Sequence, residues 1–352
     1  QIAQGIQEAH QRGKKFFLTS NVIAHNDKIR TYLRDIEPII EMKPDALIMA
    51  DPGLIMMVKE KWPETVIHLS VQANTTNYAT VKFWQKMGVE RIILSRELSL
   101  DEIEKIRQEC PDMELEVFVH GALCIAYSGR CLLSNHMTGR DANRGACAQP
   151  CRYQYALVEE KRPGEYFPIG EDAGGAFILN SRDMCMIDHV PELMDAGLDS
   201  LKIEGRAKSA YYAAIVTAAY RHAIDAAQAG EPLDPVWRAE VDKVSHRPYS
   251  TGFYYGEPGQ HTAHARYLRD WQVVGVVTSC APDGAALCEL RNKFAGGDEL
   301  ELVGPGVRPV SFRVEGLTDG DGLPIPEARK PQMPFRLRLP VQAPPLSLLR
   351  RK

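Results

Sequence analysis

The sequence predicts an α/β protein: a TIM-like (β/α) barrel that lacks its first βα unit or units, followed by a small C-terminal all-β barrel. Short apolar strands alternate with helical segments along most of the chain, which is typical of parallel βαβ units. Polar residues follow almost every strand, as in barrels whose active sites lie at the carboxyl ends of the strands. From about Trp271 the chain changes to closely spaced strands separated by Gly, Pro and Asp, which indicates a separate β domain.

Short apolar runs are the predicted strands of the barrel. They are residues 15–19, 46–50, 66–70, 91–95, 115–119 and 201–204. The helices predicted between them cover residues 29–42, 53–61, 78–87 and 99–109. The chain opens on an amphipathic helix and shows too few strands to close a barrel, so we expect one or two βα units to precede this sequence. An open doubly wound sheet is the alternative arrangement of the same units.

The alternation of strands and helices is interrupted after the fifth strand. We predict a cysteine-rich loop over residues 120–152 and an antiparallel hairpin insert over residues 153–180. A helix is then expected over residues 181–197, before the last strand of the barrel. A long helix is expected over residues 209–230, after that strand.

The composition is that of a globular enzyme, with 352 residues, 44% apolar residues, 25% charged residues and a net charge of −4. This length leaves room for two domains, and we predict a barrel over residues 1–260 and a β domain over residues 271–352. No apolar run approaches the ~20 residues that span a bilayer, and no signal-peptide pattern opens the chain, so we expect a cytoplasmic protein without membrane contact. Because the net charge is negative, any face that binds nucleic acid must be a local basic patch.

Four of the eight cysteines lie in one glycine-rich segment, with the spacing C-x6-C-x15-C-x3-C. They are Cys124, Cys131, Cys147 and Cys151. A reducing compartment favours metal binding over two disulfides for such a group. The spacing fits poorly with the paired cysteines of zinc sites, and it also differs from the common ferredoxin patterns. From the residues alone we favour an iron–sulfur cluster over zinc.

The polar residues at the predicted strand ends form a candidate active site. They are Asn21, Asp51, His68, Ser70, Gln72, Ser95, Arg96, Glu97, His120, Glu204 and Arg206. Lys202 and Glu204 share one face of their strand, and inside a barrel such charges are costly unless they are paired or catalytic. We therefore expect either a catalytic role or a buried ion pair. Arg96, Arg182 and Arg206 carry planar guanidinium groups suited to a carboxylate or phosphate substrate.

Several motifs identify a family resemblance. The segment EVFVHGALCIAYSGRCLLS and the blocks HLSVQAN, LSRELS, RGACAQPCR and SLKIEGR resemble, in the same order, the signatures of the collagenase-like peptidase family. The similarity runs from the first residue to about Leu302. Within the family, the chain is similar to the branch of prephenate-dependent tRNA uridine hydroxylases.

This resemblance implies that the four cysteines ligate a [4Fe–4S] cluster. It also implies oxygen-independent hydroxylation of the tRNA wobble uridine to 5-hydroxyuridine, with prephenate as co-substrate. The partners expected are therefore tRNA in its anticodon region, prephenate and an electron donor. Compared with the family, the opening βα units are missing, and we expect those units to contribute to the rim of the active site. The hairpin insert is shorter than in close relatives, and we expect this difference to alter contacts with RNA.

Roles for individual residues follow as hypotheses. Prephenate carries two carboxylates and therefore requires cations, while proton transfer requires titratable groups near the substrate. The predicted catalytic residues are His120, Glu204 and Lys202, and the predicted substrate-binding residues are Arg96, Arg130, Arg206, His68, Gln72 and Asp183. Cations of the β domain are expected either to contact the tRNA backbone or to form a solvated surface; they are Arg266, Arg269, Arg291, Lys293, Arg308 and Arg313.

Alternative functions remain open at this point. A ribosomal RNA hydroxylase of the same family is the first, and a hydroxylase of quinone precursors is disfavoured because that branch lacks the β domain. A peptidase is the literal reading of the family name. It would require a dyad of His120 and Cys124, because no metalloprotease motif or nucleophile elbow is present. An iron–sulfur sensor without turnover is disfavoured by the polar strand ends.

Overall fold

A computed structural model describes residues 1–124, 126–153, 155–157, 160–164, 167–168, 181–259 and 267–352. The chain forms two compact units. The N-terminal unit comprises Gln1–Glu204 and Arg247–Arg266, and the C-terminal unit comprises Gly205–His246 and Tyr267–Lys352. The long helix after the last predicted barrel strand thus groups with the β domain. None of the described helices combines the length and apolar character needed to cross a lipid bilayer.

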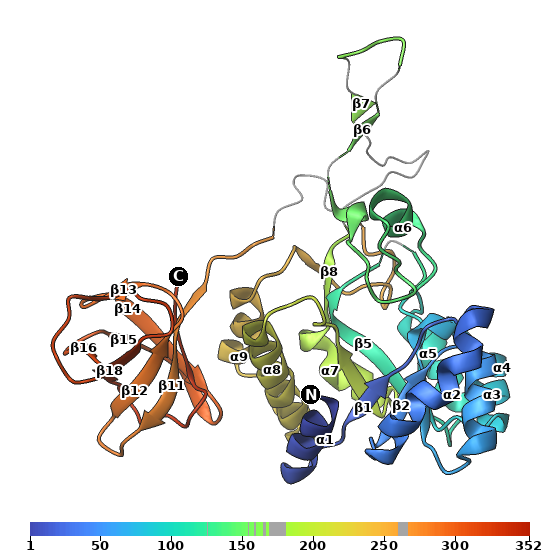
Figure 1. Cartoon of the computed structure of the whole chain (residues 1–352), viewed down its shortest axis with the longest axis horizontal. Coiled ribbons are helices and arrows are strands. Elements are labelled where there is room, and N and C mark those ends of the chain that lie inside the picture. The colour runs from blue at the N-terminus through green and yellow to red at the C-terminus, as the bar shows by residue number, and fades with distance from the viewer. Residues whose placement is uncertain (125, 154, 158–159, 165–166, 169–180, 260–266) are drawn as a thin grey trace. The chain divides into compact units, whose positions relative to one another are not determined.

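The N-terminal unit is built on a mostly parallel sheet with the order β1-β2-β3-β4-β5-β8-β10, in which β9 also pairs with β5. The strands are β1 (Phe17–Thr19), β2 (Ala46–Met49), β3 (Ile67–Leu69), β4 (Arg91–Ile93), β5 (Glu114–Ala122), β8 (Asp183–Cys185), β9 (Ser200–Ile203) and β10 (Tyr249–Ser250). The helices are α1 (Ile2–Gln11), α2 (Asn26–Glu41), α3 (Pro52–Lys61), α4 (Tyr78–Lys86), α5 (Leu100–Glu109), α6 (Leu133–Thr138) and α7 (Val190–Asp195). Helices α2 to α5 lie together along one side of the strands (Figure 1).

The alternating strands and helices predicted from the sequence are confirmed for β1 to β5 and for α2 to α5. Each strand from β1 to β4 pairs in parallel with the next strand along the chain. Asp51 and Asn77 cap the starts of α3 and α4, and Ser99 forms a capping box with Glu102 at the start of α5. The mixed α/β class with a parallel sheet is therefore confirmed, whereas closure of that sheet into a barrel stays a prediction.

Strand β5 is the longest strand of this sheet and is shared by two neighbours. Its residues Glu116 to His120 pair in parallel with β9, and His120 to Ala122 pair antiparallel with β8. The predicted helix over residues 181–197 is therefore wrong at its start, because Asp183–Cys185 is the strand β8. Long-range pairing with β5 and β10 overrides the local helical pattern there. Only α7 and the short 3-10 turn before it are helical.

The predicted hairpin insert is described in part. Strands β6 (Ala156–Leu157) and β7 (Phe167–Pro168) pair antiparallel, so the insert contains an antiparallel hairpin. The sequence predicted residues 153–159 and 175–180 as its two strands, whereas β7 lies in the segment expected to be the turn. Residues 175–180 lie outside the described residues.

The C-terminal unit contains the helices α8 (Ala210–Ala229) and α9 (Pro235–Glu240), the 3-10 turn η4 (Val241–Lys243) and an antiparallel sheet with the order β15-β14-β19-β11-β12-β18-β16. Its strands are β11 (Gln272–Cys280), β12 (Ala285–Leu290), β14 (Glu299–Gly304), β15 (Val307–Arg313), β16 (Thr318–Asp319), β18 (Pro334–Arg338) and β19 (Leu348–Arg351). The short strands β13 (Phe294–Ala295) and β17 (Glu327–Ala328) form a separate pair. A separate antiparallel β domain is thus confirmed, with its core around Phe335, Leu302 and Leu349.

Candidate active site

Polar residues that follow neighbouring strands of the N-terminal unit contact one another. Asn21, after β1, donates from Nδ2 to Ser70 Oγ at 2.9 Å, and Ser70 caps the short turn that carries Gln72 after β3. The backbone N–H of Ser95, after β4, donates to the carbonyl of Thr75. Parallel strands place their carboxyl ends at one edge of a sheet, and the candidate site is assembled at that edge.

Arg96 connects the parts of this site. Its guanidinium carbon lies 3.7 Å from the centroid of the Phe118 ring, and Nη1 donates toward Cys124 Sγ at 3.6 Å. Nη2 lies 4.0 Å from Glu204 Oε2. The side chain is only 7% exposed, so its charge acts in a largely desolvated environment. One arginine thus contacts a predicted cluster ligand and a predicted acid–base residue.

Glycine at position 121 allows β5 and the end of β9 to approach closely. Gly121 has φ +112°, and a Cβ there would lie 2.4 Å from the carbonyl oxygen of Glu204. The backbone N–H of Glu204 donates to the carbonyl of His120 at 2.8 Å. His120 is buried, and its Nε2 lies 3.4 Å from the hydroxyl of Tyr249. His120 and Glu204, two predicted catalytic residues, are therefore neighbours.

The four cysteines of the loop interact electrostatically. Burial raises the pKa of the Cys151 thiol, Arg152 opposes the rise, and Cys124, Cys147 and Cys131 raise the pKa further. All eight cysteines of the chain are free thiols in this structure. The backbone N–H of Gln149 donates to Cys147 Sγ at 3.3 Å.

This donor set fits an iron–sulfur cluster, because such clusters are held by thiolates whose sulfurs accept hydrogen bonds from the protein. Among the described residues, no three His, Cys, Asp or Glu side chains converge on a single metal position.

The cysteine loop is attached to the strand ends at several points. The side chain of Asn143 accepts from the backbone N–H of Ile23 and donates to the backbone carbonyl of Ile23, each at 3.1 Å. The backbone carbonyl of Asn143 accepts from Gln72 Nε2 at 3.5 Å. Arg130 Nε donates to Asn74 Oδ1 at 2.9 Å. These contacts place the loop over the ends of β1 and β3. No local sequence pattern marks Asn143 or Asn74 for this role.

Asp183 anchors the other end of the loop. Its Oδ1 lies 3.7 Å from Nη1 of Arg152, which is buried and also donates from Nη2 to the carbonyl of Leu123 at 3.2 Å. Asp183 Oδ2 accepts from the backbone N–H of Arg247. Asp183 thus contacts Arg152 and Arg247, and its predicted role in substrate binding stays a prediction.

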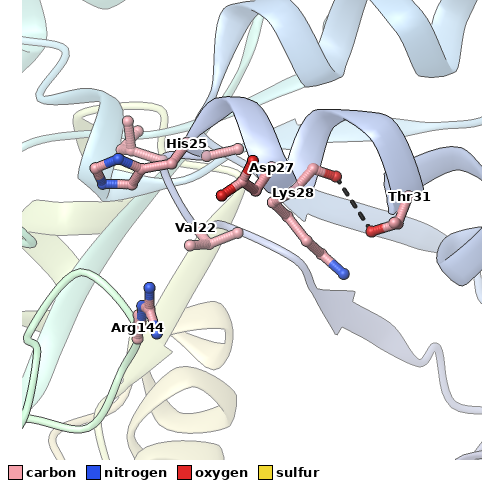
Figure 2. Close-up of a pocket in the computed structure, with 8 residues that line it drawn as sticks. Val22, His25, Asp27, Lys28, Thr31 and Arg144 are labelled. Atoms are coloured by element: carbon pink, nitrogen blue, oxygen red, sulfur yellow. Dashed lines mark hydrogen bonds between the residues drawn. The ribbon is translucent and has the colours of Figure 1, made fainter.

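A pocket of about 650 Å³ lies beside the cysteine loop, at the segment between β1 and α2. Figure 2 shows Val22, His25 and Lys28 on one side of it and Arg144 of the cysteine loop facing them. The bond between Asn143 and Ile23 holds these two walls together. The pocket therefore adjoins the same edge of the sheet as the candidate site.

Lys202 lies in an ion-pair cluster inside the N-terminal unit. Its Nζ is 2.7 Å from Glu116 Oε1, and Glu116 also accepts from Ser200 at 2.9 Å and from Arg91 at 3.3 Å. Burial alone would raise the pKa of Glu116, but Lys202, Ser200 and Arg91 together hold it below its usual value. The buried ion pair, one of the two roles expected for Lys202, is thus present.

His68 lies on β3 near this cluster, with its ring 4.7 Å from that of Phe17. Burial, reinforced by the positive charge of Arg91, lowers the pKa of His68 to about 4. Its imidazole is therefore neutral at pH 7. His68 is a buried neutral group of the sheet, and its predicted contact with substrate stays a prediction.

This pKa predicts a pH dependence of stability. Between pH 6.5 and about 4 the unfolded chain binds a proton at His68 that the folded chain does not, so the free energy of unfolding falls as the pH falls. The contribution is at most about 1.4 kcal/mol per pH unit. Urea unfolding at pH 7.5, 6 and 5 should show a shallower loss for His68→Phe than for the wild type. An identical pH dependence in the two proteins would contradict this placement of His68.

Several buried polar atoms at or near the site have no hydrogen-bond partner among the described residues. They include Gln72 Oε1, Arg96 Nε, Thr75 Oγ1 and His68 Nδ1. Buried polar atoms of native proteins are almost always satisfied, so an acceptor and a donor left open at one site indicate a polar ligand.

Arg206, also predicted to bind substrate, belongs to the C-terminal unit.

Comparison with known proteins gives the family. The model of peptidase family U32 matches residues 1–264, and the model of the peptidase family U32 C-terminal domain matches residues 269–350. The "tRNA hydroxylation protein P" of Escherichia coli is 44% identical over 367 residues, covering 92% of this chain and 81% of that protein.

Two further similarities are more distant. The "23S rRNA 5-hydroxycytidine C2501 synthase" of Escherichia coli is 38% identical over 225 residues, covering 64% of this chain and 33% of that protein. The solved structure of the U32 peptidase Mk0906 is 14% identical, with a TM-score of 0.36, over 57% of this chain and 74% of that one. The resemblance predicted from the motifs is confirmed by the two family models, and the chain belongs to peptidase family U32.

Proposed function

We propose that this protein is a tRNA-modifying enzyme that hydroxylates C5 of the wobble uridine. The proposal draws on the name of the Escherichia coli relative, a tRNA hydroxylation protein that is similar over most of both chains. The structural observation that carries it is the position of Arg96, which contacts both Cys124 and Glu204 and keeps a buried donor open. We also propose that the protein is cytoplasmic. We further propose that the parallel sheet of the N-terminal unit belongs to a (β/α) barrel.

The finer chemistry belongs to the same proposal. Hydroxylation replaces the C5–H bond of uracil by C5–OH and removes two electrons from the base. Without molecular oxygen, water would supply the oxygen atom, two protons would be released, and two electrons would leave the base for an electron acceptor. We propose prephenate as the further co-substrate that the reaction requires. Arg96 and Arg130 would bind its carboxylates, because guanidinium groups pair with carboxylates through two parallel hydrogen bonds. Gln72 would add a neutral hydrogen bond through its open Oε1.

His120 and Glu204 are the proposed proton carriers. Removal of the C5 proton requires a base at the uracil ring, and Glu204 is the more accessible of the two, with 31% of its side chain exposed. His120 is almost fully buried, so it would act through Glu204 or through the hydroxyl of Tyr249. The wobble uridine lies in a loop, where a base leaves its stack at low cost.

The four loop cysteines are the proposed ligands of a [4Fe–4S] cluster. When bound, such a cluster supplies one-electron transfer. Because the hydroxylation releases two electrons, the separate redox partner would have to accept electrons, whereas the sequence led us to expect an electron donor. Arg96 beside Cys124 and the N–H of Gln149 beside Cys147 would stabilise negative charge on the two thiolates.

Hydroxylation of ribosomal RNA is the second candidate, because the 23S rRNA 5-hydroxycytidine synthase is 38% identical over its matched region. Nucleoside mass spectrometry distinguishes hydroxylation of tRNA from hydroxylation of ribosomal RNA. The measurement uses purified tRNA and 23S rRNA from a host that lacks the gene, with and without the protein. We expect 5-hydroxyuridine derivatives to return in tRNA only, and to require a host that makes prephenate. Restoration of a hydroxylated nucleoside in 23S rRNA alone would replace the tRNA assignment by the ribosomal one.

A further inference from the structure

The C-terminal unit contains a polar groove to which the proposed reaction assigns no role. It has a volume of about 790 Å³ and is bounded by the start of α8, the entry to β11 and the end of β19. Its charged lining residues are Lys208, Arg269, Asp270, Arg351 and Lys352. Four cations against one acid, in a chain whose net charge is −4, make this groove a local concentration of positive charge.

Aromatic side chains line the same groove. Trp271 is half-buried there, with Lys243 Nζ 4.7 Å and the Arg350 guanidinium carbon 5.1 Å from its ring centroid. Lys208 Nζ lies 4.2 Å from the ring of Tyr267 and donates to the carbonyl of Ser245 at 2.9 Å. Of these groups, Lys208 and Trp271 line the groove itself, and a cation beside an aromatic ring is typical of surfaces that follow a nucleic-acid backbone.

The walls of the groove are held by a buried ion network. Arg350, which is fully buried on β19, bonds Glu301 of β14 and lies 2.6 Å from Glu240 of α9. Lys243 lies 2.9 Å from both of these carboxylates. Tyr211 of α8 accepts from Arg350 at 3.0 Å. Because these bonds join the helices to the sheet, the groove is preformed and does not require ordering when a ligand binds.

The amino-terminal end of α8 strengthens the positive potential. Ser209 caps the helix by accepting from the N–H of Tyr212, and the helix continues for 20 residues. The remaining N–H groups of the first turn and the helix dipole favour an anion near Lys208 and Ser209, which both line the groove.

Most other cations of the β domain are engaged by the protein. Arg291 pairs with Glu289, Lys293 with Glu327 and Arg308 with Asp234, and Arg313 donates to the carbonyl of Gly297. Arg266 lies outside the described residues. Arg269, by contrast, is exposed and has no hydrogen bond or ion pair among the residues that the structure describes. Of the cations expected to contact RNA, Arg269 is thus the one placed in the groove.

We propose that this groove binds the sugar–phosphate backbone of the RNA substrate. The inference rests on the proposed function, since RNA is the polyanion that such an enzyme meets at every turnover. Phosphate contacts position a nucleic acid without reading its sequence, so the groove would contribute affinity and orientation rather than the choice of base. Each phosphate that it neutralises releases counterions and makes binding dependent on salt.

The test is binding of an unmodified tRNA transcript to the full-length holoprotein, measured by fluorescence anisotropy at several salt concentrations. Arg269→Gln should weaken binding and reduce the slope of log K against log salt by about one, and Arg269→Gln combined with Lys352→Gln should reduce it by about two. Lys330→Gln, which removes an exposed charge of the same unit outside the groove, is the matched control and should bind as the wild type.

Two results would overturn the proposal that the groove binds RNA. One is an unchanged affinity for tRNA in both Arg269 variants, and the other is an equal loss of affinity in the Lys330 control. The hydroxylation assay separates this failure from failure of the proposed function. We expect Arg269→Gln to raise the KM for tRNA and leave kcat unchanged, as for a residue that does not touch the reacting base. If the Arg269 variants form 5-hydroxyuridine normally and bind RNA with unaltered affinity, the proposal that the groove binds RNA is rejected and the proposed function stands. If the variants bind RNA more weakly but the wild-type protein hydroxylates no RNA, the proposed function is rejected and RNA binding by the groove stands.

Discussion

Replacing Arg96 by methionine is expected to lower hydroxylation of tRNA about 100-fold or more while leaving the protein folded. Arg96 lies against Phe118 and beside both Cys124 and Glu204, so its removal takes a positioned cation from the centre of the site. Loss of one preorganised donor typically costs 10²–10³ in kcat. Methionine keeps the contact with the Phe118 ring, because a thioether packs well against aromatic faces.

The measurement is the initial rate of 5-hydroxyuridine formation, together with thermal unfolding and the iron content of each preparation. Arg34→Met is the matched control, since Arg34 is 77% exposed and pairs only with its neighbour Asp35. A rate for Arg96→Met within threefold of the wild type would exclude Arg96 from substrate binding. If Arg96→Met does not fold, Arg96→Lys keeps the charge and should still lose most activity, because lysine lacks the planar fork.

Gly121→Ala is expected to destabilise the N-terminal unit by about 3 kcal/mol and to abolish activity. The added methyl group would meet the carbonyl oxygen of Glu204 at 2.4 Å, and the backbone at φ +112° disfavours any side chain. Because Glu204 also bonds the carbonyl of His120, the clash would separate the two proposed proton carriers.

Gly139→Ala separates this clash from the effect of backbone conformation. Gly139 also has a positive φ, +69°, but nothing lies within 4 Å of a Cβ built there. We expect it to cost about 1 kcal/mol, the penalty of the left-handed conformation alone. Urea unfolding of both variants is the measurement, and equal losses of stability would show that the approach of β5 to the end of β9 is not critical.

Much of the fold is readable from the sequence because it is local. Runs such as residues 46–50 are apolar enough for a buried parallel strand, and Ser99 with Glu102 marks the start of a helix. The strand β19 has no comparable local signal, although it lies in the middle of its sheet. Its four residues include Arg350, whose buried ion pairs with Glu240 and Glu301 cannot be seen from the chain around it.

In the candidate site, too, some features follow from local sequence patterns and others depend on contacts between distant parts of the chain. Strand-end positions predicted that Arg96, His120 and Glu204 would lie together, because the carboxyl ends of parallel strands share one edge. The partners of these residues come from distant parts of the chain: Tyr249 is 129 residues from His120, and Asn143 is 120 residues from Ile23. No local pattern marks such residues.

Charged residues on buried strands are the hardest to assign. Lys202 and Asp183 have the residue types of a catalytic site, and their sequence positions are compatible with catalysis or with ion pairing. The structure shows Lys202 bonded to Glu116 and Asp183 beside Arg152. Which role such a residue takes depends on partners that only the folded chain brings within reach.

The most direct test of the central claim is nucleoside mass spectrometry of tRNA from a host that lacks this gene, complemented with the wild type or with Cys147→Ala and grown without oxygen. Cys280→Ala, which removes a free thiol of β11 outside the loop, is the matched control. We predict that 5-hydroxyuridine derivatives return with the wild type and with Cys280→Ala, and stay absent with Cys147→Ala, whose protein should also lack iron. Full restoration by Cys147→Ala would contradict a reaction that depends on the cysteine loop.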